Sequence, residues 1–274
     1  MNIYKMDYIS TLFIVGVISL IIAVTILVVI IFTLNSHIRD FKACVINLPR
    51  RRDRLVEFGK HYTLPVKYDI IDAVDGRLLN VDELVKNNVI GNHGLQSLIN
   101  TEHGIPKKYH YELGTVGAIG CSLSHIKAWE KIVKENIKMM MVFEDDAWVI
   151  GMTLSDIQDR LNDIPEDWHI YMIGQPHTIL EGIPTKEKTK LYKVTRFCGT
   201  HAYIVNLQGA QWLLSYGKLL PIEQQIDAHL SELASDHGLN IYIHLNKPFV
   251  SPFGGNSDIQ VMSDNATFDR LQIV

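Results

Sequence analysis

Two kinds of hydrophobic pattern divide this chain: one unbroken apolar run, and a longer region of short alternating patterns. From Ile9 to Leu34 no residue is charged and almost every residue is apolar. About 20 apolar residues in a helix are enough to cross a bilayer. The apolar part of a cleaved signal peptide is usually about 7–15 residues and ends in a small-residue cleavage site, and this run fits neither condition. The pattern predicts a tail over 1–8, a transmembrane helix over 9–34, a linker over 35–42 and one domain over 43–274.

The predicted domain alternates between strand-like and helix-like patterns. Its length of about 230 residues suits a single α/β domain. Between residues 86 and 113 no period is visible, and we expect a binding loop or lid there. Elsewhere the alternation predicts an α/β fold with a mostly parallel sheet and helices on both faces. Strands are expected at 43–48, 66–71, 138–143, 168–173, 202–205 and 240–245, and helices at 52–61, 122–135, 154–161, 207–216 and 226–236.

The expected strand at 138–143 ends in three consecutive acids, Glu144, Asp145 and Asp146. Carboxylates at the end of a buried strand can hold a divalent cation, because hard cations prefer oxygen ligands. Side chains alternate along an extended chain, so we expect Glu144 and Asp146 to face one way and Asp145 the other. One face would then bind a metal, and the other would contact a ribose hydroxyl or a supporting residue. A solvated acidic loop is the competing interpretation of this segment alone.

Polar residues also follow the first two expected strands. The segment VINLPRRRDR contains Asn47, Arg51 and Arg54 where a strand turns into a helix. Arginines in such a place bind phosphate or stack on a base, or they begin a solvated basic helix. Asp75 follows the second strand, where an acid can bind a ribose or form an ordinary turn with the next glycine. The sequence alone leaves both pairs of alternatives open.

Two later segments carry further candidate chemistry. In GAIGCSLSH, Ser122 or Ser124 could cap a helix whose N-terminus favours anions, and the glycines would let the backbone approach a ligand. His125, at the end of this segment, is either a packing histidine or a ligand contact. Asp227 lies at the start of the expected helix 226–236 and is either a helix cap or a general base.

Charge and cysteine content limit the partners but leave the compartment open. The net charge of −4 and the lack of a basic stripe argue against nucleic acid as a partner. Cys44, Cys121 and Cys198 all adjoin apolar sequence, which is typical of buried thiols. Positive charges after the apolar run would keep the domain in the cytoplasm, whereas the sequon at Asn265 points to a lumenal domain. We expect a single-pass membrane protein, with the endomembrane lumen favoured and the orientation open.

Six motifs in order resemble those of glycosyltransferase family 25, which includes bacterial lipooligosaccharide and collagen hydroxylysine galactosyltransferases. They are VINLPRRRDR, AVDG, IGCSLSH, FEDDA, GTHAY followed by GA, and SDI, and they extend from about Cys44 to Ile259. Each motif is weak by itself, whereas six in the same order are specific. The chain departs from the family pattern at Ala118, where the family usually has a glutamate.

The resemblance implies a GT-A type, Rossmann-like domain that uses a UDP-sugar donor and a divalent cation, in the first place Mn²⁺. It implies that Asp146 ligates the metal directly, that Glu144 supports it, and that Asp227 is the base of an inverting transfer. His244 and Asp258 are open alternatives for a distal metal ligand. The donor site that the resemblance implies comprises Asn47, Arg51, Arg54, Asp75, Ser124, His125 and Asp145.

The predicted function is therefore the transfer of galactose or glucose to a glycan, glycolipid or hydroxylysine acceptor by a membrane-anchored enzyme. One alternative is a catalytically silent family member that acts in adhesion or assembly. Another is a metal-dependent hydrolase, which would usually need a histidine-rich pair at helical spacing, and no such pair adjoins the acidic run in the sequence.

Overall fold

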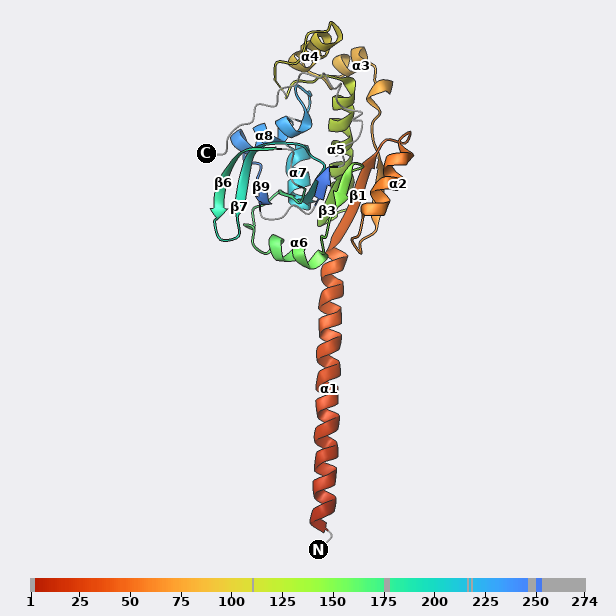
Figure 1. The fold of residues 1–274 in the computed structure, drawn as a ribbon, viewed down its shortest axis with the longest axis vertical. Coiled ribbons are helices and arrows are strands. Elements are labelled where there is room, and N and C mark those ends of the chain that lie inside the picture. The colour runs from red at the N-terminus through yellow and green to blue at the C-terminus, as the bar shows by residue number, and fades with distance from the viewer. Residues whose placement is uncertain are drawn as a thin grey trace. The chain divides into compact units, whose positions relative to one another are not determined.

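The computed structural model describes residues 3–109, 111–174, 178–215, 217, 219–245 and 250–252. The chain divides into two compact units, Met1–Phe41 and Lys42–Val274. The first unit is essentially one helix, α1 (Ile3–Asp40), which is longer at both ends than the predicted span (Figure 1). Within α1, the 19 residues Thr11–Val29 have a mean hydropathy of 3.2, and their side chains are exposed. By length and composition, α1 is a candidate membrane span.

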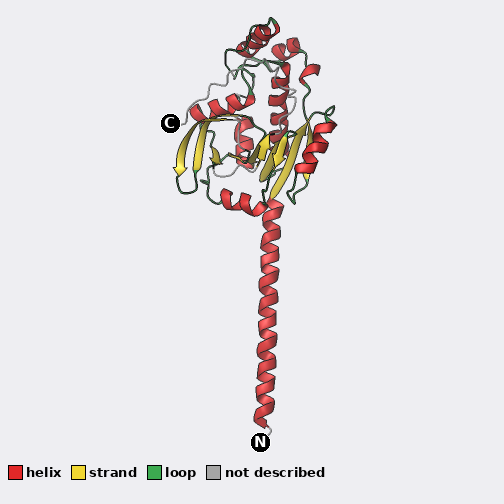
Figure 2. Ribbon diagram, in the orientation of Figure 1, coloured by secondary structure: helices red, strands yellow, loops and turns green. Residues whose placement is uncertain are grey.

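The second unit is built on a sheet of eight strands in the order β2-β1-β3-β8-β5-β9-β7-β6 (Figures 1 and 2). A separate two-stranded sheet pairs β10 with β4. The strands of the large sheet are β1 (Phe41–Asn47), β2 (Tyr68–Asp72), β3 (Met139–Glu144), β5 (Ile170–Met172), β6 (Thr178–Lys186), β7 (Leu191–Cys198), β8 (Ala202–Asn206) and β9 (Ile241–His244). The small sheet contains β4 (Ala147–Val149) and β10 (Val250–Pro252).

The large sheet is mixed, which corrects the expectation of a mostly parallel sheet. Strands β1 and β2 are parallel, as are β5 and β9. The pairs β3/β8, β5/β8, β7/β9 and β6/β7 are antiparallel. Two of these four pairs come from β8, which runs antiparallel to both of its neighbours, and the other two involve a hairpin, β6–β7, that the sequence pattern did not reveal. Its second strand buries only some of its side chains, so it lacks the apolar run of a fully buried strand. The α/β class itself is confirmed.

Helices pack around the large sheet, and α5 is the longest in this unit. It contacts β2, β3, α7 and α8, and it buries Trp129 and Ile132 in the main core. The helices are α2 (Arg52–His61), α3 (Val81–Lys86), α4 (Asn92–Glu102), α5 (Val116–Lys134), α6 (Leu154–Leu161), α7 (Leu207–Ser215) and α8 (Ile226–Asp236), together with a short 3₁₀ helix, η1 (Gly76–Leu78).

The region without a visible period, residues 86–113, contains helix α4 and is therefore not an irregular loop throughout. Both ends of this region join a second apolar cluster. In this cluster Ile90 and Leu113 pack against Ile119 of α5 and Ile222. Val89 and Gly91 exchange backbone hydrogen bonds with Ile222, so the segment is held to the chain that precedes α8. The expected lid is a small packed layer over the start of α5.

Helix α5 begins earlier than the sequence pattern predicted. Thr115 is its N-cap and accepts a hydrogen bond from the amide of Ala118, so neither Ser122 nor Ser124 caps it. Both serines lie inside the helix and are buried. Ser124 Oγ donates to the carbonyl of Gly120 and accepts from the amide of Val74. It therefore joins α5 to the loop after β2, and its predicted contact with the donor stays a prediction.

Candidate active site

The C-terminal ends of β1 and β3 lie on the same side of the large sheet as the start of β8. Strand β3 lies between β1 and β8. Because β8 runs antiparallel to β3, with Phe143 opposite Ala202, the residues that precede β8 lie beside the acids that follow β3. The topology thus brings the predicted residues Asn47 and Glu144 to the same place as Thr200, which was not predicted.

Asp145 and Asp146 both contact Arg54. Arg54, in helix α2, places its Nη2 atom 2.7 Å from Asp145 Oδ1 and 2.9 Å from Asp146 Oδ2. Asn47, at the end of β1, donates from Nδ2 to Asp145 Oδ2 at 2.7 Å and to the carbonyl of Arg51 at 2.9 Å. These contacts fix the position of both aspartates relative to the start of α2.

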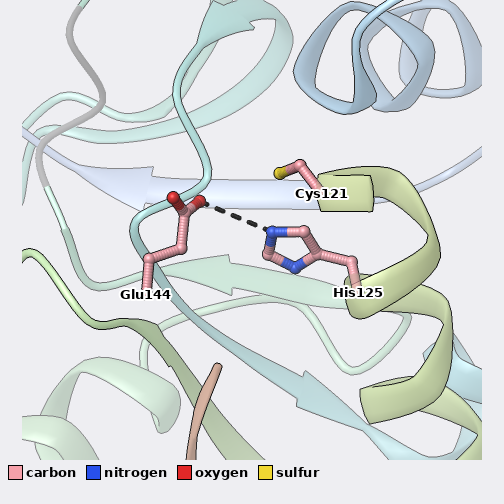
Figure 3. A group of neighbouring side chains, drawn as sticks. All are labelled: Cys121, His125 and Glu144. Carbon is pink, nitrogen blue, oxygen red and sulfur yellow. Dashed lines mark ion pairs between the residues drawn. The ribbon is translucent and has the colours of Figure 1, made fainter. Parts of the chain in front are cut away.

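Glu144 faces other residues. Its Oε1 atom accepts a hydrogen bond from Thr200 Oγ1 at 2.7 Å and lies 3.4 Å from His125 Nε2 (Figure 3). The predicted alternation is therefore wrong: Glu144 and Asp146 do not pair off against Asp145. Strand β3 ends at Glu144, and the two aspartates lie in the turn that follows, where the alternation of an extended chain no longer applies.

The three carboxyl groups differ in their proton affinity. Burial and the neighbouring charge of Glu144 raise the pKa of Asp146 to about 7, although Arg54 opposes the shift. Burial also raises the pKa of Asp145, against the pull of Arg54 and Asn47. For Glu144 burial acts in the same direction, but His125 and Thr200 outweigh it and hold the pKa at about 2. Negative charge is therefore costly at Asp146, and an added cation would relieve it.

Two buried oxygen atoms at this turn lack a hydrogen-bond partner among the described residues, Asp146 Oδ1 and Asn47 Oδ1. Buried polar atoms are normally paired, so orphaned oxygens are expected where a ligand binds. Both are hard donors of the kind that Mg²⁺ and Mn²⁺ prefer. The residues present therefore fit the divalent cation that the motifs implied.

Asp227 lies in the first turn of α8, near this cluster. Its Oδ2 atom accepts from the amide of Gly199 at 2.8 Å, and its Oδ1 atom accepts from the amide of Ala228 at 2.8 Å. The N-cap of α8 is Gln225, so Asp227 is not itself the cap residue. Burial raises the pKa of the Cys121 thiol well above its usual value, and the charges of Glu144, Asp227 and Asp146 raise it further. The carboxylates of the acidic turn and of α8 therefore both act on the pKa of this thiol.

The remaining predicted residues have local partners. Arg51 is the residue before α2 and binds Asp53, although its charge also lowers the pKa of Asp145. Asp75 lies between Arg50, at 2.9 Å, and Arg77, at 2.7 Å, and these arginines hold the pKa of its carboxyl below the usual range.

His125 is brought into the site, but His244 has partners elsewhere. His244 Nε2 lies 3.1 Å from Asp163 Oδ2, and its Nδ1 lies 3.1 Å from the hydroxyl of Tyr171. Both ring nitrogens are thus engaged, which makes His244 a poor distal metal ligand. Asp258, the SDI motif and the sequon at Asn265 lie outside the described residues.

Sequence reasoning missed Cys121, Thr200 and Tyr203. Cys121 and His125 are four residues apart in α5, and that spacing on one helix face was the available signal. A cysteine beside apolar sequence is usually an ordinary buried thiol, so the sequence alone did not mark Cys121 as part of the site.

Comparisons with known proteins agree with the motifs. Residues 41–230 match the sequence profile of Glycosyltransferase family 25 (LPS biosynthesis protein). Human Procollagen galactosyltransferase 2 is 28% identical over 194 residues, which cover 66% of this chain and 29% of that protein. Human Inactive glycosyltransferase 25 family member 3 is 28% identical over 214 residues, 70% of this chain and 33% of that protein. The chain thus spans about a third or less of the length of these relatives.

A search of solved structures gives weaker similarity. The crystal structure of a glycosyltransferase involved in the glycosylation of the major capsid of PBCV-1 matches with a TM-score of 0.36 and 9% sequence identity, over 80% of this chain and 94% of that chain. The profile match over residues 41–230 confirms the family resemblance that the motifs indicated. The expected GT-A type α/β class is confirmed with it.

Proposed function

The chain belongs to glycosyltransferase family 25, and on that premise we propose that it transfers galactose or glucose from a UDP-sugar to a glycan, glycolipid or hydroxylysine acceptor. The observation that carries the proposal is the acidic turn after β3. There Asp145 and Asp146 share Arg54, and a buried oxygen of Asp146 has no partner among the described residues. Relatives named as galactosyltransferases favour a hexose donor.

The donor's diphosphate would bind at this turn. Glu144 and Asp146 are the residues that would hold a divalent cation such as Mn²⁺, which when bound offsets the negative charge that develops on the leaving diphosphate. Asp145, already oriented by Asn47 and Arg54, is placed to accept hydrogen bonds from the ribose. The charge of Arg51 lowers the pKa of Asp145, which supports a place for Arg51 beside the donor's phosphates.

Asp227 is the proposed base. In an inverting transfer the acceptor hydroxyl attacks from the face opposite the leaving diphosphate, so its proton must be taken by a group on that side. Asp227 comes from α8, whereas the proposed cation ligands come from the end of β3, and the amides of Gly199 and Ala228 orient its carboxylate. These contacts support a carboxylate that is held in one position.

Helix α1 is the proposed membrane anchor. Its apolar stretch is long enough to cross a bilayer, and its side chains are exposed as those of a lipid-facing helix would be. We place the protein as a single-pass membrane protein, with the domain in the endomembrane lumen as the favoured orientation.

The decisive experiment is a screen of donor hydrolysis across nucleotide sugars, using the full chain in detergent with and without Mn²⁺. We expect one UDP-hexose to be hydrolysed only with the cation. The variant Asp146→Asn should lose about 10²-fold or more of this rate, by analogy with other lost electrostatic stabilisers. Asp159→Asn, in an exposed position of α6, is the matched control and should be unchanged.

Two outcomes would contradict parts of the proposal. Full hydrolysis in a chelator, or by Asp146→Asn, would exclude the cation site at the turn. Binding of a nucleotide sugar without any turnover would instead favour a silent family member that acts in adhesion or assembly. That alternative is kept because relatives named as inactive match the chain as well as the galactosyltransferases do.

A further inference from the structure

A second group of possible metal ligands lies against the acidic turn, at the face of α5. Cys121 and His125 are one helical turn apart and point toward Glu144 (Figure 3). Cys121 Sγ, a ring nitrogen of His125 and a carboxylate oxygen of Glu144 all lie within 4.8 Å of one another. Three different ligand types therefore converge from a helix and from a strand end.

His125 supplies the observation that points to a ligand. Its side chain is 1% exposed, and Nε2 has no hydrogen-bond partner among the described residues, although Glu144 Oε1 lies 3.4 Å away. The other ring nitrogen, Nδ1, is 2.9 Å from the hydroxyl of Tyr203. The ring is thus fixed on one side, and on the other it presents a buried nitrogen to Cys121 and Glu144.

The surroundings would hold these ligands in place. A histidine that binds a metal commonly donates its other ring N–H to a fixed acceptor. Here the Tyr203 oxygen, which already accepts from Trp129 Nε1 at 3.0 Å, has a second acceptor position for His125 Nδ1–H. Thr200 Oγ1 donates to Glu144 Oε1 at 2.7 Å and orients the carboxylate in the same way.

We propose that Cys121, His125 and Glu144 bind one divalent transition-metal ion of the Zn²⁺ type, with a fourth position left open. One sulfur, one nitrogen and one oxygen ligand form a donor set that Zn²⁺ accepts in tetrahedral geometry. Ligand atoms around such an ion are about 3.3–3.8 Å apart. His125 Nε2 and Glu144 Oε1 already have this separation, at 3.4 Å, so the Cys121 thiol is the group that needs to approach, by about 1 Å at most. Rotation of the Cys121 side chain would supply this movement, while Thr200 keeps the Glu144 carboxylate oriented.

This site is distinct from the proposed Mn²⁺ site, although the two share Glu144. A thiolate and an imidazole favour Zn²⁺-like ions, whereas Mn²⁺ prefers carboxylate oxygens such as those of Asp146 and Glu144. Glu144 has two carboxylate oxygens, and only Oε1 faces His125 and Thr200. The bound ion would join α5 to the end of β3 and fix the carboxylate that borders the donor site.

Cobalt spectroscopy tests the proposal without relying on activity. The full chain in detergent is stripped with a chelator and titrated with Co²⁺, which replaces Zn²⁺ and is coloured. We expect the near-ultraviolet charge-transfer band that only a thiolate ligand gives, saturating at one equivalent and abolished by added Zn²⁺. Cys121→Ser should lose this band, and Cys198→Ser, a thiol of similar exposure, should keep it.

Two further measurements separate the possible failures. Asp146→Asn should retain the cobalt–thiolate band even if it abolishes donor hydrolysis, so this proposal can fail or succeed independently of the proposed function. Zn²⁺ should raise the melting temperature of the unmodified chain and of Cys198→Ser but not of Cys121→Ala, whose fold is checked by near-ultraviolet circular dichroism. A chain that gives no charge-transfer band, or the same band in Cys121→Ser, would overturn the site and leave a simple His125–Glu144 pair.

Discussion

At the residue scale, Asp227 is held by two backbone amides, and this determines how its role can be tested. Asparagine in its place retains one acceptor oxygen but turns an NH₂ group toward one of the amides of Gly199 and Ala228. We therefore expect Asp227→Asn to lose about 1–3 kcal/mol of stability. If Asp227 is the base, turnover should also fall by about 10²–10⁴-fold while donor affinity stays unchanged.

Steady-state kinetics and donor binding, both measured well below the melting temperature, separate these effects. Asp236→Asn, in the last turn of the same helix and exposed, is the control and should leave both quantities unchanged. Turnover near normal in a folded Asp227→Asn protein would assign the base to another residue. A parallel loss of donor affinity would mean that the amide contacts shape the donor site.

At the element scale, Gly120 of α5 has a structural role. The sequence suggested that the glycines of this segment let the backbone approach a ligand. In the structure, a Cβ atom at Gly120 would lie 2.4 Å from the carbonyl oxygen of Val74, so the glycine lets α5 approach the loop after β2. We expect Gly120→Ala to cost about 1–3 kcal/mol in urea denaturation, because neither backbone segment can yield freely.

A helix glycine without this constraint is the matched control. Gly59, in α2, is exposed, and its added Cβ would meet only the Tyr68 hydroxyl at 3.3 Å. Gly59→Ala should be neutral or stabilise the protein by up to about 1 kcal/mol, through helix propensity. Equal stability of Gly120→Ala and the unmodified chain would show that the loop moves aside at no cost.

Asp163 joins three elements and gives a pH-dependent prediction. It follows α6, lies 2.7 Å from Lys186 Nζ at the end of β6 and contacts His244 Nε2 at the end of β9. The contacts with Lys186 and His244 help to lower the pKa of its carboxyl below the usual value of 3.8. A lowered pKa stabilises the fold above the unfolded value and loses this contribution as pH falls.

Asp163→Asn should therefore be less stable than the unmodified chain by about 1 kcal/mol at pH 7, a modest figure because Lys186 is half exposed. Below about pH 4 the difference between the two free energies of unfolding should shrink. The measurement is urea denaturation of both proteins across this range. A difference that stays constant down to low pH would show that the carboxylate charge is not what stabilises this junction.

Local patterns predicted some elements well and others poorly, for physical reasons. The helices α2, α6 and α8 have the bounds that periodicity predicted. Each has apolar residues along one face and polar residues along the other, and this pattern can be read directly from the sequence. The hairpin β6–β7 was missed because its partly exposed strands carry no such signal and depend on pairing across the sheet. Helix α4 was missed because its glycine, asparagine and histidine content resembles a loop.

The candidate site shows the same division. The acidic run could be recognised from three consecutive carboxylates after an apolar strand. The way these acids divide between Arg54 and His125 could not, because it depends on where β3 ends and on how α2 and α5 pack. Thr200 enters the site only because β8 runs antiparallel to β3, a relation that no local pattern encodes.

At the scale of the whole molecule, the two compact units predict separable properties. The unit from Lys42 onward has its own apolar core, and the residues proposed for donor binding and transfer all belong to it. The exposed apolar surface of Thr11–Val29 belongs to the other unit. The full chain should therefore stay with membranes after alkaline carbonate extraction, whereas residues 39–274, which keep the buried Phe41 of β1, should be soluble and hydrolyse the donor at the same rate.

A cleaved leader would have the same apolar character as an anchor, so the size of the mature protein must be measured as well. Mass spectrometry of the membrane-extracted protein should find residues 9–34 still attached, because an anchor works only if it is retained. Loss of this segment together with release from the membrane would identify a leader. A soluble 39–274 protein that is folded but inactive, beside an active full chain, would mean that α1 contributes to the reaction through more than attachment, since its sequence holds none of the proposed site residues.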